Sequence, residues 1–293
     1  MTRTLMIAGA VLAAMPSIAV AQEGRPESYM RFFGGVHEPV SKRTSGTVPG
    51  AFTEEGLADV RLVSIRGLDD AADFNDADFR AVSAAADALD AALGGRRQET
   101  SMGYGLGALI GVRVSPRIGA ELEVAHRSHD VEGSTSEQLY DANADAFTGA
   151  FQGLLDTGAA TAPAVVEPEG AEQTLAVTTY MANASYFFPA WGRVAPYASA
   201  GLGWASPAGD VSDYKGNVAY QVRAGADLDL GLLLLGVQGT YVGAGDFERE
   251  LPAVELTPPL TGAAETFGGP GQATVEYGTA EVAVTVTVPL SRR

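Results

Sequence analysis

The residues with the clearest potential for chemistry lie in segment 126–129, which reads His-Arg-Ser-His. Side chains of an extended chain alternate between two faces, so His126 and Ser128 share one face. A histidine beside a serine can act as the base that turns the hydroxyl into a nucleophile, and Glu132 or Glu137 could orient the imidazole. The pattern therefore suggests the catalytic histidine and serine of a hydrolase. The simpler interpretation is a polar strand end.

Two other motifs resemble ligand sites, one for phosphate and one for a divalent cation, but neither has the full pattern of such a site. Gly103–Gly107 alternates glycine with larger residues, yet no helix opens after it, so a phosphate-binding loop is rejected. A run of carboxylates suits Ca²⁺ or Mg²⁺ but lacks the glycine and the final glutamate of an EF-hand. We therefore predict no metal site and no cofactor. The carboxylates of this run are Asp69, Asp70, Asp73, Asp76 and Asp78.

Composition limits the classes of function. The chain has 293 residues, of which 46% are hydrophobic and 19% charged, and its formal net charge is −17. Such an acidic chain is a poor candidate for binding nucleic acid. It has no cysteine, which excludes disulfides, thiolate metal sites and cysteine nucleophiles.

The N-terminus has the pattern of a secretory signal peptide. Arg3 precedes the apolar run Leu5–Ala14, and the small residues of 19–21 come just before Gln22. The run is too short to span a bilayer as a helix, and the Ala-Val-Ala site follows at the usual distance. We predict that residues 1–21 are removed and that residues 22–293 form one exported domain.

Eight segments of the remaining chain alternate with a period of two. In Tyr104–Val114, for example, the even-numbered residues are apolar or aromatic, and the odd-numbered ones include three glycines and Arg113. This period is typical of strands. The segments are longer than average globular strands and match the roughly 9–11 residues of a tilted membrane strand. The others lie within 30–37, 118–125, 179–186, 194–204, 218–230, 233–241 and 279–288.

The connections also alternate in length. Long loops occupy about 41–101, 128–173 and 246–273, and a medium one occupies 206–216, whereas tight turns lie near Pro116, Pro189 and Gly231. The acidity is concentrated in the longer loops, since the second carries nine acidic and no basic residues. Short turns at one end and long loops at the other are typical of outer-membrane barrels.

The face of the strands opposite the apolar one carries the charged residues. In a barrel of eight strands this face points into an interior just wide enough to be filled by side chains, where charges must pair. We predict a packed polar plug, with a narrow ion path as the alternative. The predicted lumenal charge network comprises Arg31, Arg113, Glu121, Glu123, Arg127, Arg223, Asp227, Asp229 and Glu281.

Segments such as Gly103–Val114, Ile118–Arg127, Val194–Trp204 and Val275–Val288 resemble the small outer-membrane β-barrel proteins of the OmpA/OmpX and opacity type, often labelled porin-family. The resemblance implies an all-β, eight-stranded antiparallel up-and-down transmembrane barrel in the cell outer membrane. Members usually end in an aromatic residue, whereas this chain ends in Arg293.

A second resemblance concerns activity. The His-x-Ser pair of His126 and Ser128 is similar to the pair that outer-membrane lipid A deacylases carry on the membrane face of the same kind of barrel. That family has Asn where His129 stands here, and its pair lies late in the chain. A deacylase-like hydrolase is therefore kept only as a second alternative.

Two stretches within the long loops have helical spacing. Asp69–Leu93 is rich in alanine, with an apolar stripe that includes Phe74, Val82 and Leu89, and it is followed by a pair of glycines. Glu137–Leu155 is similar. These helices could form a lid over the barrel mouth or a surface that binds a partner. The simpler expectation is a solvated loop with transient helix.

The function predicted from these patterns is structural or surface-interacting, without catalysis. The acidic loops would face outward and meet outer-membrane lipid, lipopolysaccharide, or an extracellular or envelope protein. The protein is expected to be a monomer. A small diffusion pore is the first alternative.

Overall fold

The computed structural model describes residues 26–41, 43–68, 74–168 and 172–291. Its main feature is a closed barrel of eight antiparallel strands. Strand β6 pairs with both β5 and β7, which closes the sheet in the order β6-β5-β1-β15-β10-β9-β8-β7. The strands are β1 (Ser28–Pro39), β5 (Gly103–Arg113), β6 (Ile118–Glu132), β7 (Glu172–Phe187), β8 (Val194–Gly209), β9 (Asn217–Asp229), β10 (Leu234–Ala244) and β15 (Gly278–Ser291).

The eight strands are those that the alternating pattern predicts, so the predicted fold class is confirmed. Each follows its predecessor in an up-and-down order, and β15 closes the barrel by pairing with β1 from Tyr29↔Pro289 to Pro39↔Thr279. This register leaves consecutive residues on opposite faces of the wall. One face therefore holds the apolar residues of every strand, and the other holds the lumenal ones.

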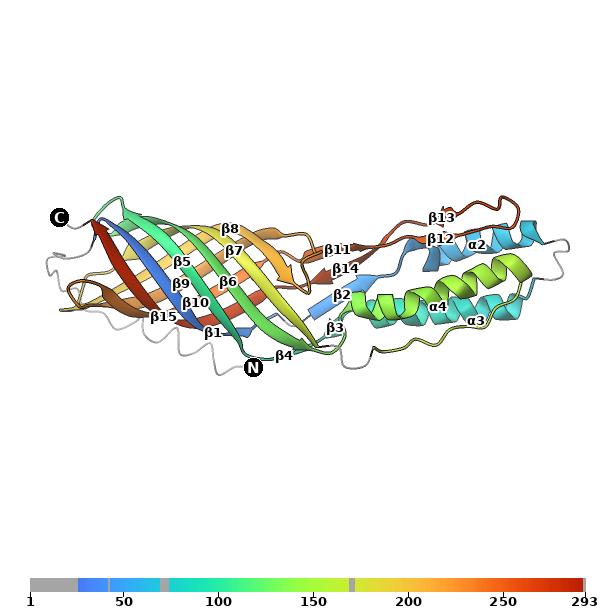
Figure 1. Ribbon diagram of the computed structural model, residues 1–293, viewed down its shortest axis with the longest axis horizontal. Coiled ribbons are helices and arrows are strands. Elements are labelled where there is room, and N and C mark those ends of the chain that lie inside the picture. Colours follow the sequence, from blue (N-terminus) through green and yellow to red (C-terminus); the bar gives the residue numbers. More distant parts are fainter. Residues whose placement is uncertain (1–25, 42, 69–73, 169–171, 292–293) are drawn as a thin grey trace.

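The two ends of the barrel differ. At one end, which we call the short-turn end, β5 and β6, β7 and β8, and β9 and β10 are joined by turns of a few residues. The first and last strands also meet there, where the hydroxyls of Ser28 and Ser291 are 2.8 Å apart. The long connections all leave from the opposite end (Figure 1).

The long connections fold into a second unit, here called the extension, that continues the long axis of the barrel (Figure 1). Its helices are α2 (Glu54–Gly67), α3 (Asp76–Leu93) and α4 (Ser136–Thr157), preceded by a short 3-10 turn, Gly50–Phe52. Its strands are β2 (Arg43–Thr47), β3 (Arg96–Arg97), β11 (Phe247–Leu251), β12 (Val254–Leu256), β13 (Glu265–Phe267) and β14 (Gly271–Val275). They form a four-stranded sheet, β11-β14-β2-β3, and the hairpin β12-β13, while β4 (Glu99–Thr100) pairs with the end of β6.

The extension has a hydrophobic core of its own. Phe52 stacks on Phe151 with ring centroids 5.2 Å apart and lies beside Phe147 of the same helix. Val82, Leu89 and Leu93, which the predicted stripe of α3 includes, are fully buried. The expectation of a solvated loop with transient helix is therefore wrong, because three helices bury their apolar faces against one another.

The helix boundaries follow local signals. Asn75 caps α3 by accepting from the backbone of Ala77 and Asp78, so this helix begins at Asp76 and not at the predicted Asp69. Residues 69–73 lie outside the described part of the chain. Helix α4 begins with a capping box formed by Thr135 and Gln138. None of the helices in the described ranges combines the length and hydropathy needed to cross a membrane.

Candidate functional site

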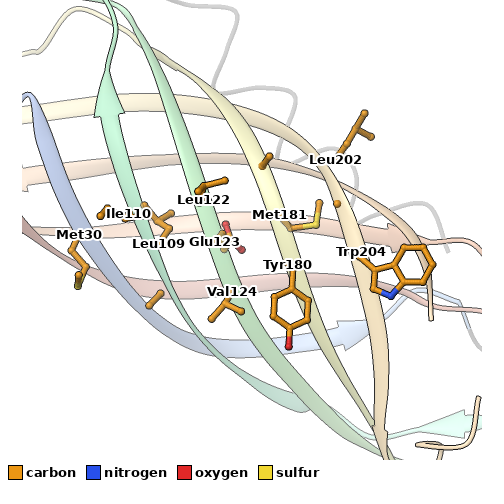
Figure 2. Close-up of a pocket in the computed structure, with 13 residues that line it drawn as sticks. Met30, Leu109, Ile110, Leu122, Glu123, Val124, Tyr180, Met181, Leu202 and Trp204 are labelled. Carbon is orange, nitrogen blue, oxygen red and sulfur yellow. The ribbon is translucent and has the colours of Figure 1, made fainter. Parts of the chain in front are cut away.

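The outer wall of the barrel is apolar over the middle of its strands, including the hollow that Figure 2 shows. The side chains of Ile110, Val222 and Val284, from three different strands, are 47–56% exposed. Aromatic residues lie near both ends of this apolar wall, with Tyr104, Trp204 and Tyr220 toward the extension. Water would be a poor solvent for so large a continuous apolar surface. A lipid bilayer suits it, because the strands satisfy their backbone hydrogen bonds within the closed sheet.

The lumen holds charged side chains in ion pairs. Nearest the short-turn end, Arg31 donates through Nη2 to Asp227 at 2.7 Å and through Nε to the hydroxyl of Thr287 at 2.9 Å. Its guanidinium also lies over the ring of Tyr197, 4.2 Å from the centroid. Opposite charge and a cation–π contact together compensate for the removal of this guanidinium from water.

A larger group follows in the middle of the lumen. Arg223 forms an ion pair with Glu123, and its Nη1 is 3.6 Å from Glu121. Glu123 also accepts from the side-chain amides of Asn183 at 3.2 Å and Gln221 at 3.0 Å.

Glu121 is held by a different donor. It accepts a hydrogen bond of 2.5 Å from the hydroxyl of Tyr29. The two neighbouring carboxylates of β6 therefore share Arg223 but otherwise differ in their partners.

The third ion pair lies toward the extension. Arg127 donates through Nε to Glu281 at 2.7 Å and through Nη1 to Thr179 at 3.1 Å. His37, also buried, lies close to the hydroxyl of Thr279 (2.8 Å) and the carbonyl of Ser128 (3.2 Å). These contacts complete a column of paired charges along the barrel interior.

Apolar side chains also line the lumen, some of them beside this column: Met181 pairs with Glu123 and Val177 with Arg127 in the β6–β7 ladder. Val177, Met181, Ala205, Ala219 and Val242 point inward from β7, β8, β9 and β10 and are at most 3% exposed. They belong to the same continuous hydrophobic cluster as the helices of the extension. The core of the extension therefore continues into the lumen of the barrel.

Glycines make room for the large lumenal side chains. A side chain at Gly107 would collide with the ring of Phe33, and one at Gly111 would collide with the ring of Tyr29. Both glycines face the lumen from β5, and Gly107 is the last residue of the segment Gly103–Gly107 that was rejected as a phosphate-binding loop. Their role is thus explained by packing.

One small internal hollow lies beside the Arg31–Asp227 pair. Its volume is about 20 Å³, close to the space that one water molecule needs. Arg113, predicted as lumenal, borders this hollow at the short-turn end, where its guanidinium lies 5.3 Å from the centroid of Phe187. Asp229 is half-buried at the neighbouring turn and accepts from the backbone of Gly231. The other seven predicted residues are all buried within the lumen.

The predicted hydrolase pair has other contacts. His126 points outward, and its Nδ1 is 3.0 Å from the hydroxyl of Thr178 on the neighbouring strand. Ser128 is only 5% exposed. Of the two carboxylates considered as third members, Glu137 forms an ion pair with Arg249 of the extension, and Glu132 lies opposite Glu99 in the β4–β6 ladder.

The extension is tied together by polar contacts that sequence patterns did not indicate. Arg96 donates two hydrogen bonds to Glu167, at 2.9 and 2.8 Å, and Ser134 donates a third. These donors lower the pKa of Glu167 below its usual range. Burial raises the pKa of Tyr140 to about 12, and its hydroxyl donates to the carbonyl of Pro252.

Within the described ranges, no three or more carboxylates and histidines are grouped as a metal site would require. Asp76 and Asp78 lie in the first turn of α3, where they favourably face the helix N-terminus. Asp69, Asp70 and Asp73 lie outside the described residues.

Comparisons with known protein families and with curated proteins find no match. Among solved structures, the outer membrane protein OprG from Pseudomonas aeruginosa is similar, with 12% identity, a TM-score of 0.44, and coverage of 90% of this chain and 97% of that one. Neisserial surface protein A has 12% identity, a TM-score of 0.39, and coverage of 92% and 100%. The outer membrane protein AlkL has 10% identity, a TM-score of 0.37, and coverage of 96% and 99%. The resemblance to the OmpA/OmpX and opacity family stays a prediction.

Proposed function

We propose that the protein is an outer-membrane barrel that holds an acidic, helical extension on the cell surface, where it has a structural or binding role. The observation that carries this proposal is the continuous hydrophobic cluster joining the extension to the upper lumen. A core shared in this way fixes the extension relative to the membrane. The filled lumen leaves little space for a diffusing solute.

Export and location belong to the same proposal. Residues 1–21 have the pattern of a signal peptide. The short-turn end would face the periplasm, and the extension would face outward. The partner in this proposal is an envelope or extracellular component that contacts the extension of a monomer, together with the surrounding lipid and lipopolysaccharide.

The proposal also excludes catalysis by the His126 and Ser128 pair. A serine nucleophile needs its base within hydrogen-bond reach and access to substrate. His126 is engaged with Thr178, and Ser128 is buried. Mass spectrometry of lipid A from cells with and without the protein should show the same acyl chains; a lost chain would contradict the proposal.

Single cysteines test the placement directly, because the natural chain has none. Leu62→Cys lies on an exposed face of α2 and Pro116→Cys on an exposed short turn. A membrane-impermeant maleimide applied to intact cells should label the first and reach the second only after lysis. Labelling of both or neither in intact cells would contradict the orientation.

Two further measurements test the barrel and its filled lumen. The protein should be found in the outer-membrane fraction and migrate differently on gels after heating. In planar bilayers it should give no steady conductance. Recovery from the soluble periplasm would contradict the membrane location, and steady conductance would favour the diffusion pore.

A further inference from the structure

The segment that follows α4 crosses the surface of the extension without regular secondary structure. It comprises residues 159–168, is called the strap here, and returns from the far end of the extension toward the barrel (Figure 1). Ala160, Ala162 and Val165 are partly buried against the hydrophobic core of the helices. Among the described residues, the backbone of the strap makes no hydrogen bond to another backbone group. The strap therefore contacts the extension through side chains alone.

Asn143 of α4 binds the backbone of the strap. Its Nδ2 donates to the carbonyl of Val166 at 2.9 Å, and its Oδ1 accepts from the backbone nitrogen of Val166 at 2.8 Å. Asn143 itself is only 1% exposed. Its amide makes the two contacts that a neighbouring β-strand would make, so it suits any residue with a free backbone N–H.

The strap is nearly extended where it meets Asn143. Gly158 ends α4, and Asn143 lies 15 residues before it, which corresponds to about 22 Å of helix. The strap covers this distance in only eight residues, from Gly158 to Val166. That rise per residue is close to the limit for a stretched chain. The surface beneath the strap therefore accommodates an extended peptide.

The next residue of the strap is bound through its side chain. Arg96 of β3 donates from Nη1 and Nη2 to the two carboxylate oxygens of Glu167, and the hydroxyl of Ser134 donates to the second of them. A guanidinium that holds both oxygens selects a carboxylate by its shape as well as by its charge. The extension thus supplies one contact for a peptide backbone and one for the acidic side chain that follows it.

We propose that the surface beneath the strap is a docking site for an extended acidic segment of a partner protein, and that the strap covers this site in the free protein. The partner would place small apolar side chains where Ala162 and Val165 lie, its backbone against Asn143, and a carboxylate against Arg96. The strap itself shows which chemistry fits. The inference rests on the proposed binding role of the extension and names the kind of partner.

The charge around Arg96 favours an acidic partner. Strands β2 and β3 place Arg43 opposite Arg97, the residue that follows Arg96, and both of these side chains are exposed. Three guanidiniums therefore lie together at the end of the strap that carries its carboxylate, although the protein as a whole is acidic. Local positive charge of this kind attracts an acidic segment and orients it before contact.

The strap competes with any partner because it is tethered beside the site. A short tether gives a segment an effective concentration on the order of millimolar. A free peptide should therefore bind the unaltered protein weakly. It should bind better when the strap is weakened and the surface beneath is left intact. Glu167→Gln does this, since it removes the carboxylate of the strap and leaves Arg96 and Ser134 in place.

The probe is a fluorescently labelled synthetic peptide with the sequence of residues 159–168, blocked at both ends so that its glutamate is the only carboxylate. Its fluorescence anisotropy is measured with the whole protein in detergent micelles. The dissociation constant should be several-fold lower for Glu167→Gln than for the unaltered protein. A second peptide with glutamine in place of the glutamate should bind weakly to both.

Two further variants are matched to Glu167→Gln. Arg96→Gln loosens the same contact from the other side but also removes the group that binds the carboxylate of the peptide, so it should give no gain. Glu255→Gln changes an exposed glutamate on β12, away from these contacts, and should bind the peptide as the unaltered protein does. The heat-dependent gel shift should persist in every variant, which verifies that the barrel is folded.

Peptide binding that Glu167→Gln does not strengthen, or that Arg96→Gln strengthens equally, would overturn the docking site. Equal binding of the glutamine peptide would overturn the role of the carboxylate. A dimer of the Glu167→Gln protein on cross-linking would show that the strap of a second copy is the occupant, which would overturn the choice of partner. If the peptide fails but Leu62→Cys is labelled on intact cells, the docking site alone is contradicted and the surface location stands.

Discussion

Arg127 and Glu281 form an ion pair inside the barrel, with Nε and Oε2 2.7 Å apart and both side chains at most 1% exposed. They come from β6 and β15, which are separated in the sheet by β5 and β1. The pair therefore links strands that share no backbone hydrogen bonds. Because the pair is shielded from water, each charge is stabilised by its partner and not by hydration.

Removing one member of this pair should be costly. Glu281→Ala leaves the guanidinium of Arg127 buried without its carboxylate, and such changes cost about 3–5 kcal/mol. Urea titration of the folded barrel in detergent micelles measures the loss. Glu250→Ala is the control, since its ion pair with Lys215 has the same 2.7 Å separation but is solvent-exposed, and it should change stability very little. Equal losses would show that water reaches the lumenal pair.

Substitutions of Glu121 and Glu123, the two carboxylates beside Arg223, should lower the stability of the barrel by different amounts. Glu123→Gln removes the charge that faces Arg223 and places an amide next to those of Asn183 and Gln221, so it should lower the urea midpoint clearly. Glu121→Gln keeps an oxygen that can accept from Tyr29 and leaves Glu123 paired with Arg223. Its effect should be smaller. A larger loss for Glu121→Gln would contradict this assignment of partners.

The barrel is predictable from sequence because its signal is local. The alternation in Tyr104–Val114 assigns each residue to the wall or the lumen without knowledge of any partner strand. Which acid pairs with which base is not local, since Glu281 is 154 residues from Arg127. Pairing depends on the register of four strands in the closed sheet.

The extension was predictable only in part. Helix α3 has a clear stripe, but α2 was missed although Thr53 precedes Glu54 and Glu55 and caps the helix through Gly56. Capping and the spacing of Leu57 and Val60 could have indicated it. The shared core could not have been found in this way, because Phe52 and Phe151 meet only after two separate loops fold together.

Removing a large side chain from that core should loosen the extension and spare the barrel. Phe151→Ala leaves a cavity beside Phe52, and such changes cost about 3–5 kcal/mol. Limited proteolysis should cut α4 faster, while the heat-dependent gel shift of the barrel persists. Leu62→Ala, on an exposed face of α2, is the control and should leave proteolysis unchanged. Loss of the gel shift in Phe151→Ala would show that the two units unfold as one.

Acidic pH should weaken the contacts of Glu167 with Arg96 and Ser134 and so destabilise the segment around 162–168. Arg96 and Ser134 lower the pKa of Glu167 in the folded protein, so the stabilisation is complete above the usual glutamate pKa. It is lost as pH falls through the lowered value. The protection of the amides around 162–168, measured relative to their intrinsic exchange rate at each pH, should therefore fall at acidic pH. Arg96→Gln should raise the exchange already at neutral pH and flatten the dependence; an unchanged profile would contradict the role of this contact.

The apolar wall provides the most direct test of the membrane interpretation. Val284 lies in the middle of β15, points outward and is 56% exposed. In a water-soluble barrel, Val284→Arg would be harmless or favourable, because the guanidinium would be hydrated. In a bilayer it should cost about 2–4 kcal/mol near the midplane. Folding into phospholipid vesicles measures this cost, with Leu62→Arg on the exposed face of α2 as a control that should not change it. A barrel that folds into vesicles equally well with arginine at both positions would show that this face does not contact hydrocarbon.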